Sequence, residues 1–221
     1  WRIPPELTKK GIKNDPYKIW ISEIMLQQTG VKTVHNYYIN FIKKWPKIQN
    51  LNEACENDIL KEWSGLGYYR RALNLKKCAE IICEKYNGKF PDSEKELLNL
   101  PGIGSYTAAA IISIAFDKPA IVIDGNIQRI TSRLYEIKED LKKSKSKIYE
   151  KLEKIISKKR PGDFAQALMD LGSTICKPVN PKCNCCPLLK YCLAHKNNTY
   201  KFIPLKTKKL NKVIKKGYLY I

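Results

Sequence analysis

Apolar residues recur along this chain at intervals of three and four, the spacing that places them on one face of an α-helix. No sustained alternation of apolar and polar positions, which is typical of a half-buried strand, interrupts this pattern. The fold class is therefore expected to be all-α. The pattern predicts helices over residues 17–29, 31–43, 54–64, 69–86, 94–99, 106–115, 126–134, 146–157 and 163–172.

The charge of the chain is large and unevenly distributed. The formal net charge is +20 over 221 residues. Residues 1–140 hold 21 Lys and Arg against 17 Asp and Glu, a net of +4, whereas residues 141–221 hold 20 against 4, a net of +16. This favours an anionic partner such as nucleic acid, with a solvated lysine-rich surface as the alternative. No apolar stretch is long enough to span a bilayer, so we expect a soluble protein with no membrane partner.

Five of the eight cysteines lie between residues 176 and 192. Such a group in a chain without secretory features indicates a metal site in a reducing compartment. Four thiolates suffice for a tetrahedral Zn²⁺ or for a 4Fe–4S cluster, and their spacing alone does not distinguish the two. The candidate ligands are Cys176, Cys183, Cys186 and Cys192. Cys185 is left over, with an exchange of roles with the adjacent Cys186 as the alternative.

The string LPGIG at residues 100–104 lies between two predicted helices. Gly102 and Gly104 allow a tight turn, and the exposed amides at the start of the next helix suit a phosphate oxygen. In isolation the string is also compatible with an ordinary helix–helix turn. Together with the sites below, it resembles the hairpin of helix–hairpin–helix DNA-binding proteins, which hold the DNA backbone without reading sequence.

Asp124 follows a short apolar run and precedes a predicted helix. It is therefore a candidate helix N-cap, and the helix dipole and amides favour its ionised form. An ionised carboxylate facing a cleft also suits the stabilisation of a sugar cation. Capping and catalysis are compatible at this position.

Glu23 is the only charged residue between Lys18 and Lys32, and its helical neighbours are apolar. Burial disfavours an ionised carboxyl group and raises its pKa, which makes a protonated acid available near neutral pH. The alternative is a structural Glu that bridges two helix ends. One protonated and one ionised carboxyl group form the pair that cleaves a glycosidic bond.

Taken together, these segments resemble the endonuclease III superfamily and, within it, the MutY-type adenine DNA glycosylases. The resemblance runs from about residue 15 to residue 192. No single piece is decisive, but their order and separation are. The most specific pieces are SEIMLQQT (22–29), WSGLGYYRRALNL (63–75), LPGIGSYTAAAI (100–111), IDGNIQR (123–129) and QALMDLG (166–172), followed by the cysteine spacing.

The resemblance implies two helical lobes with the active site between them. Residues 17–118 would form the helix–hairpin–helix six-helix barrel, and residues 1–16 with 119–205 would form the iron–sulfur cluster lobe. Residues 206–221 are expected to be a basic linker toward a missing C-terminal domain that recognises 8-oxoguanine. Because the chain opens at Trp1 without a Met, we expect a fragment. The cysteine spacing is that of the family's 4Fe–4S loop, which disfavours Zn²⁺.

The resemblance also implies catalytic roles. Glu23 would protonate the adenine, Asp124 would stabilise the sugar cation or its covalent adduct, and Asn126 would assist nearby. Tyr106 falls where lyase relatives carry a Schiff-base Lys, which implies a monofunctional glycosylase that uses water.

Further residues match positions that contact DNA in the family. Tyr68 would wedge into the base stack while the target base is extruded, since filling the gap offsets part of the unstacking cost. The alternative for Tyr68 is a core aromatic at a glycine-rich corner. The full set of DNA-contact candidates is Gln28, Thr29, Leu66, Tyr68, Gly102, Gly104 and Gln166.

These expectations together describe a base excision repair enzyme that acts as a monomer on double-stranded DNA containing adenine opposite 8-oxoguanine or guanine. The expected location is a bacterial cytoplasm, at the nucleoid, with an organelle or the nucleus as the alternatives. Trp1 and Arg2 resemble a family segment, but about a dozen residues separate them from Asp15, so their part in the adenine pocket stays open. Three alternatives also stay open: a thymine mismatch glycosylase, an endonuclease III-like lyase, and a non-catalytic DNA-binding iron–sulfur module.

Overall fold

The computed structural model describes residues 2–205, and this part of the chain is helical. Within it there is one isolated bridge, between Asp140 and Leu205, and no strand. The all-α prediction is therefore confirmed. Trp1 and the expected basic linker at 206–221 lie outside the described residues. None of the helices in the described part is long and apolar enough to cross a bilayer.

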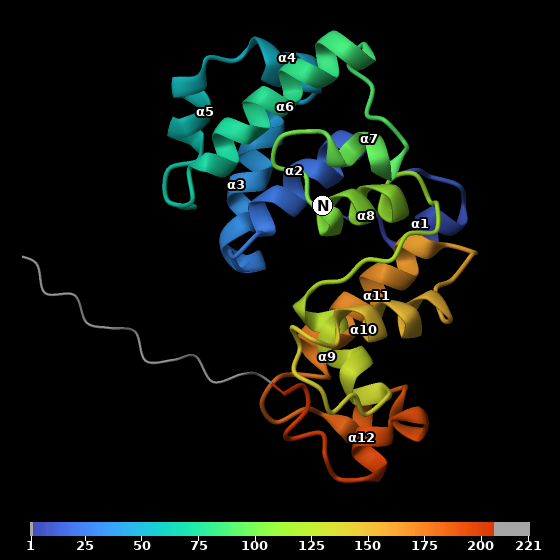
Figure 1. Ribbon diagram of the computed structural model, residues 1–221. Coiled ribbons are helices and arrows are strands. Elements are labelled where there is room, and N and C mark those ends of the chain that lie inside the picture. The colour runs from blue at the N-terminus through green and yellow to red at the C-terminus, as the bar shows by residue number, and fades with distance from the viewer. Residues whose placement is uncertain (1, 206–221) are drawn as a thin grey trace, which may run out of the picture.

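The helices gather in two groups that lie one above the other (Figure 1). The first group comprises α2 (Pro16–Leu26), α3 (Val31–Lys44), α4 (Ile48–Glu53), α5 (Glu56–Glu62), α6 (Arg70–Tyr86), α7 (Glu94–Leu98) and α8 (Ser105–Ile114). The second comprises α9 (Gly125–Leu134), α10 (Lys145–Glu153), α11 (Pro161–Thr174), two short 3₁₀ turns at Cys183–Cys185 and Leu189–Tyr191, and α12 (Leu193–Lys196). The chain crosses between the groups after α8, and the proposed lobe boundary at 118/119 falls in this crossing.

All nine predicted helices are present, and three short ones were not predicted. These are α1 (Pro5–Lys9), α4 and α12, each of six residues or fewer. Several predicted helix ends also differ from the structure by two to four residues. The helix predicted from residue 54 begins only at Glu56, because α4 ends directly before it. The helix predicted to run to residue 157 ends at Glu153, where the carbonyl of Leu152 accepts from the amides of both Ile155 and Ile156.

Helix α2 is the buried centre of the first group. Asp15 caps it by accepting a 2.9 Å hydrogen bond from the amide of Tyr17, and Pro16 occupies its first turn, where no amide donor is needed. It packs against α3, α6 and α8, and from Ile19 to Met25 every side chain is buried. This packing fixes Glu23 in the interior.

The helix predicted to run to residue 29 ends at Leu26. Gln28 has a φ of +57°, in the left-handed region that a helix cannot continue through. The side chain of Arg71 on α6 donates to the carbonyls of Ile24, Met25 and Gln27 at this end. The carbonyl of Ile24 also accepts from the amide of Gln27. Carbonyls at the end of a helix are short of main-chain donors, so a side chain distant in sequence supplies them here.

The predicted hairpin joins α7 to α8. Gly102 lies at its tip with a φ of +78°, a conformation that favours glycine. A methyl group at Gly102 would lie 2.9 Å from Cβ of Asn74, so the turn packs closely on α6. The hairpin is thus held against the first turns of α6.

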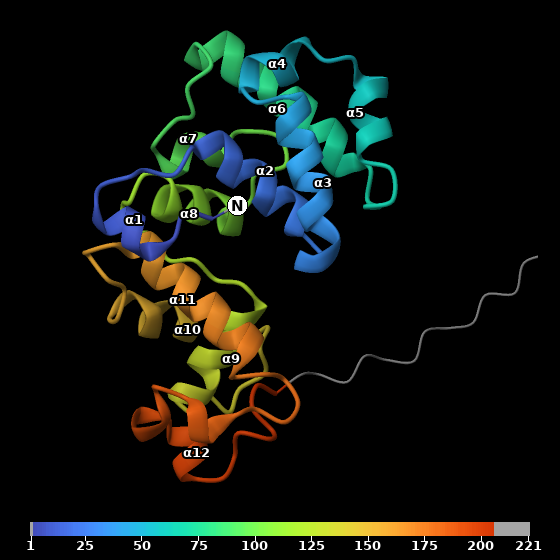
Figure 2. The same cartoon turned by 180° about the vertical axis from the view of Figure 1, so that it is seen from behind.

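The two groups of helices meet where α11 packs against α8 (Figure 2). At Gly162 the contact is so close that a methyl group would lie 2.5 Å from the carbonyl oxygen of Ser113. We call this α8–α11 contact around Gly162 and Ser113 the seam. Because main chain lies against main chain here, the seam has little room for adjustment.

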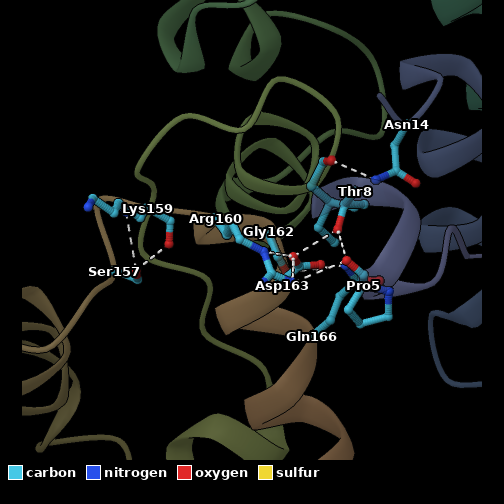
Figure 3. A network of polar contacts seen from close by, with 10 residues as sticks. Pro5, Thr8, Asn14, Ser157, Lys159, Arg160, Gly162, Asp163 and Gln166 are labelled. Atoms are coloured by element: carbon cyan, nitrogen blue, oxygen red, sulfur yellow. Dashed lines mark hydrogen bonds and ion pairs between the residues drawn. The ribbon is translucent and has the colours of Figure 1, made fainter. Parts of the chain in front are cut away.

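The N-terminal segment ties the two groups together beside the seam (Figure 3). Oδ2 of Asp163 accepts hydrogen bonds from Thr8 at 2.9 Å and from Nε of Arg160 at 2.6 Å. Asn14 donates to the carbonyl of Ile114 at the end of α8. Residues 5–14 therefore contact both α8 and the start of α11.

Candidate active site

Glu23 lies in the last turn of α2 with 3% of its surface exposed, as the sequence pattern predicts. Burial raises the pKa of its carboxyl group, because the ionised form loses its hydration. A hydrogen bond from Tyr106 and the charge of Arg2 act in the opposite direction, whereas the charge of Asp124 raises the pKa further. Since burial is the largest of these influences, Glu23 is a group that retains a transferable proton above the usual range of a Glu.

Tyr106, the second residue of α8, donates a 2.6 Å hydrogen bond from its hydroxyl to Oε2 of Glu23. Burial raises the pKa of the phenol well above its usual range, and the nearby Glu23 raises it further. The hydroxyl therefore stays protonated and acts as a donor. The charges of Arg2 and Asp124 both influence the pKa of Glu23 and that of Tyr106, so the four side chains lie within electrostatic range of one another.

Asp124 is the N-cap of α9, as predicted. Its Oδ1 accepts a 2.7 Å hydrogen bond from the amide of Ile127, and its Oδ2 accepts a 2.9 Å hydrogen bond from Nδ2 of Asn126. Both bonds stabilise a carboxylate, and the N-terminus of the helix adds a favourable dipole. Capping thus fixes in place a carboxylate whose charge influences Glu23.

Asn126 is itself held by Arg129, one turn further along α9. Nη2 of Arg129 donates hydrogen bonds to Oδ1 of Asn126 (2.9 Å) and to the carbonyl of Gly172 on α11 (2.7 Å). Its Nε donates a 2.7 Å hydrogen bond to the carbonyl of Cys176. The guanidinium therefore links the Asp124–Asn126 pair to the start of the cysteine-rich loop. We did not anticipate Arg129 from the sequence, although it ends the string IDGNIQR; an Arg three residues after Asn126 was the available signal.

The four predicted cysteine ligands line one cavity, together with apolar side chains and the ring of His195. Arg133 of α9 lies at its edge, with Nη1 3.4 Å from Sγ of Cys176 and donating to the carbonyl of Lys177 at 2.7 Å. Cys185 is exposed and is not part of the lining. The donor set is thus four soft thiols in an apolar pocket, the environment that iron–sulfur clusters occupy. No group of three or more His, Cys, Asp or Glu side chains within residues 2–205 is arranged to hold one metal ion.

The predicted DNA-contact residues divide into an exposed and a buried set. Tyr68 is 64% exposed, so the alternative that it is a core aromatic is wrong. Gln28, Gly102 and Gly104 are also exposed, and Thr29 is half-buried.

Leu66 and Gln166 belong to the buried set, with 5% and 8% of their surface exposed. Nε2 of Gln166 donates to the carbonyl of Gly162, and its side chain lies at a cavity of about 110 Å³ beside the N-terminal segment. Their assignment to DNA contact stays a prediction.

The sequence and the fold were compared with known proteins. A family model described as "HhH-GPD superfamily base excision DNA repair protein" matches residues 21–158. Adenine DNA glycosylase of Buchnera aphidicola subsp. Baizongia pistaciae is 45% identical over 210 residues, which cover 95% of this chain and 60% of the relative. Adenine DNA glycosylase of Homo sapiens is 40% identical over 197 residues, covering 88% of this chain and 36% of the human protein. The chain thus spans about 60% of the bacterial relative's length.

Solved structures show the same fold. A thermostable thymine-DNA glycosylase superposes with a TM-score of 0.75 at 32% identity, covering 83% of this chain and 85% of that one. A non-covalent endonuclease III–DNA complex superposes with a TM-score of 0.72 at 26% identity, covering 85% of this chain and 87% of that one. Both neighbours share the helical arrangement described above.

Proposed function

The chain belongs to the HhH-GPD superfamily of base excision DNA repair proteins, and we propose that it hydrolyses the N-glycosidic bond of adenine paired with 8-oxoguanine or guanine. The observation that carries this proposal is the 2.6 Å hydrogen bond from Tyr106 to a buried Glu23 that is coupled to Asp124. This pair combines a carboxyl group of raised pKa with a carboxylate held by an amide and a side-chain donor. The relatives named adenine DNA glycosylase support adenine as the base released.

The reaction follows from the two carboxyl environments. Glu23 gives its proton to the adenine while the bond between the sugar C1′ and the base nitrogen breaks, and the bonding electrons leave with the base. Asp124 stabilises the positive charge that develops on the sugar. A water molecule then adds its oxygen to C1′, and the proton it loses returns to the carboxylate of Glu23. The products are free adenine and an abasic sugar.

Because residue 106 is a Tyr, we expect a monofunctional glycosylase that releases the base without cutting the strand. A phenol has no amine with which to form a Schiff base, so the strand stays uncut after the base is released. Its hydroxyl instead holds Oε2 of Glu23 in place.

The exposed residues at the end of α2, on the turn at 65–68 and on the hairpin at 100–104 support double-stranded DNA as the partner. Base release from a duplex requires that the target nucleotide leave the stack. Tyr68, exposed at the tip of its turn, is the proposed wedge, and Gln28 and Thr29 are the proposed contacts to the opposite strand. Gly102 and Gly104 present main chain to the DNA backbone. We expect the protein to act on this duplex as a monomer.

We assign Cys176, Cys183, Cys186 and Cys192 as ligands of a 4Fe–4S cluster. When bound, such a cluster would supply a cross-link for a loop whose regular structure is limited to two short 3₁₀ turns. That loop carries Lys177 and Lys182, which suit contact with phosphates. The cluster is therefore structural, and base release needs only Glu23, Asp124 and water.

One assay tests the proposal against its rivals. The purified protein is incubated under single-turnover conditions with duplexes carrying adenine opposite 8-oxoguanine, adenine opposite guanine, or thymine opposite guanine. Free adenine from the first two, with no release of thymine, is the expected result. Release of thymine would identify the chain as a thymine mismatch glycosylase. Borohydride trapping of a covalent protein–DNA complex would identify it as a lyase. Binding without release of any base would identify a non-catalytic DNA-binding module.

A further inference from the structure

The first turns of α6 contact three segments that carry predicted DNA-contact residues. These segments are residues 27–29 at the end of α2, the turn at 65–68, and the hairpin tip at Gly102. Arg71 contacts the first two, and Asn74, three residues later on the same helix face, lies against Gly102. One rigid surface thus supports all three segments.

Arg71 makes its contacts to the end of α2 with one edge of its guanidinium. Nη1 lies within hydrogen-bonding distance of the carbonyls of Ile24 at 2.8 Å, Met25 at 3.0 Å and Gln27 at 2.7 Å. Carbonyls at the end of a helix lack partners and carry a partial negative charge, so a cation there is favourable. This edge holds the main chain directly before Gln28.

The other edge of the same guanidinium holds the turn that presents Tyr68. Nη2 donates to the carbonyls of Leu66 at 3.1 Å and Gly67 at 3.2 Å, and it also reaches Oγ1 of Thr29 at 3.4 Å. The guanidinium carbon lies 5.2 Å from the ring centroid of Trp63 and 5.7 Å from that of Tyr68. A single planar group therefore spans the two segments.

Both segments contain a residue in an unfavourable backbone conformation. Gln28 has a φ of +57° and Tyr68 a φ of +48°, and neither is a glycine. Such conformations persist where the surroundings over-determine them, and they cluster at sites of function. Arg71 contacts Gln27 and Thr29 on either side of Gln28, and Gly67 immediately before Tyr68.

We propose that Arg71 is a positioning residue for base extrusion, which fixes Tyr68 and the Gln28–Thr29 segment in one spacing so that both engage the duplex together. This inference rests on the proposed function. A Lys at position 71 cannot make the same contacts, because its ammonium is a compact charge and lacks the planar guanidinium whose two Nη atoms reach both segments. Arg71 touches neither the leaving base nor the sugar in this scheme, so its effect is confined to the opening of the base stack.

The test compares Arg71→Lys with Arg70→Lys, which makes the same change at the exposed neighbouring position. Single-turnover adenine release is measured on a fully paired duplex with adenine opposite 8-oxoguanine, and on the same duplex with mismatches on either side of the target. We expect Arg71→Lys to slow release about 10–100-fold on the paired duplex, since misplacement by about 1 Å has effects of this size. The flanking mismatches weaken the stack, so the deficit should shrink to about threefold or less. Arg70→Lys should stay within about twofold of the parent on both duplexes, since its surface charge is retained.

A second measurement does not depend on catalysis. Amide hydrogen exchange of the DNA-free protein should be faster in Arg71→Lys at residues 27–29 and 65–69, and unchanged in α11. An equal deficit on both duplexes, or unchanged exchange in these two segments, would overturn the inference. If the parent protein releases no adenine, the proposed function fails, and the exchange measurement still decides whether Arg71 fixes the two segments.

Discussion

The hydroxyl of Tyr106 on α8 donates a 2.6 Å hydrogen bond to Oε2 of Glu23 on α2. The bond joins the first turn of one helix to the last turn of another, 83 positions apart in the sequence. In this bond the phenol donates and Oε2 accepts, so Oε1 is left to carry the proton of the acid. This arrangement, with Asp124 coupled to the same site, gives the first three predictions below.

Glu23→Gln keeps the shape of the side chain and can still accept from Tyr106, but it has no proton to transfer. We expect adenine release to slow by at least about a hundredfold, the low end for loss of a general acid. DNA affinity and thermal stability should be retained. Single-turnover kinetics with a parallel binding titration separates these effects. Full single-turnover activity in the variant would remove Glu23 from the mechanism.

Asp124→Asn retains a cap for α9, because Asn is as good an N-cap as Asp, but it removes the negative charge. Release should slow about 100–1,000-fold, the range seen when one stabilising group at a developing charge is lost. Asp15→Asn is the matched control, since Asp15 caps α2 through the amide of Tyr17 in the same way. Base release by the control should stay within about twofold of the parent. Equal losses in the two variants would show that the cap alone matters.

Tyr106→Phe should change the pH dependence of base release. Glu23 must be protonated to act, so the rate declines as pH rises through its pKa, which burial raises. The Tyr106 hydroxyl lowers that pKa by donating to the carboxylate. Without it the pKa rises further, and the alkaline limb of the pH–rate profile should move to higher pH. A single-turnover profile that moves to lower pH would contradict the assignment of Glu23 as the acid.

Cys183→Ser should remove a ligand of the cluster and loosen the loop that carries Lys177. We expect loss of bound iron, destabilisation by at least about 3 kcal/mol and weaker DNA binding, all in the same variant. Cys185→Ser is the control, because that thiol is exposed and lies outside the cavity lining. Iron content, thermal unfolding and a DNA titration check these outcomes. Normal DNA binding by iron-free protein would contradict a structural role for the cluster.

Gly162→Ala tests the seam. The added methyl group would lie 2.5 Å from the carbonyl oxygen of Ser113, so α11 must move away from α8. Overpacking of this kind costs about 1–3 kcal/mol, or about 2–4 °C in Tm for each kcal/mol. Gly125→Ala is the control, since a methyl group there meets nothing within 4 Å. Thermal unfolding of both variants is the measurement, and an equal effect would show that the seam is not tightly packed.

Local features of the sequence sufficed to predict the burial of Glu23 and the capping of α9 by Asp124. Glu23 is a lone charge in an apolar helix, and Asp124 stands at the boundary between an apolar run and a helix, so burial and capping followed from their neighbours. The length of α4 explains why it was not predicted, because a helix of six residues contains too few turns for its apolar period to be recognised. The end of α2 was wrong for a different reason. It depends on Arg71, whose contacts with α2 span 44 to 47 positions of sequence.

The arginines that organise the site were not predicted, for the same physical reason. Arg129 reaches Gly172 across 43 positions, and Arg133 reaches Ile203 across 70. Each satisfies main-chain carbonyls, which every residue possesses, so no residue type at the partner position reveals the contact. Their role becomes visible only when the helices are packed.

Glu23 belongs to one group of helices and Asp124 to the other, and the seam is where these groups press main chain against main chain. The separation of the two proposed reacting groups therefore depends on how closely α8 and α11 pack at the seam. A substitution along the seam can thus change the distance between Glu23 and Asp124 while every side chain of the candidate site stays the same.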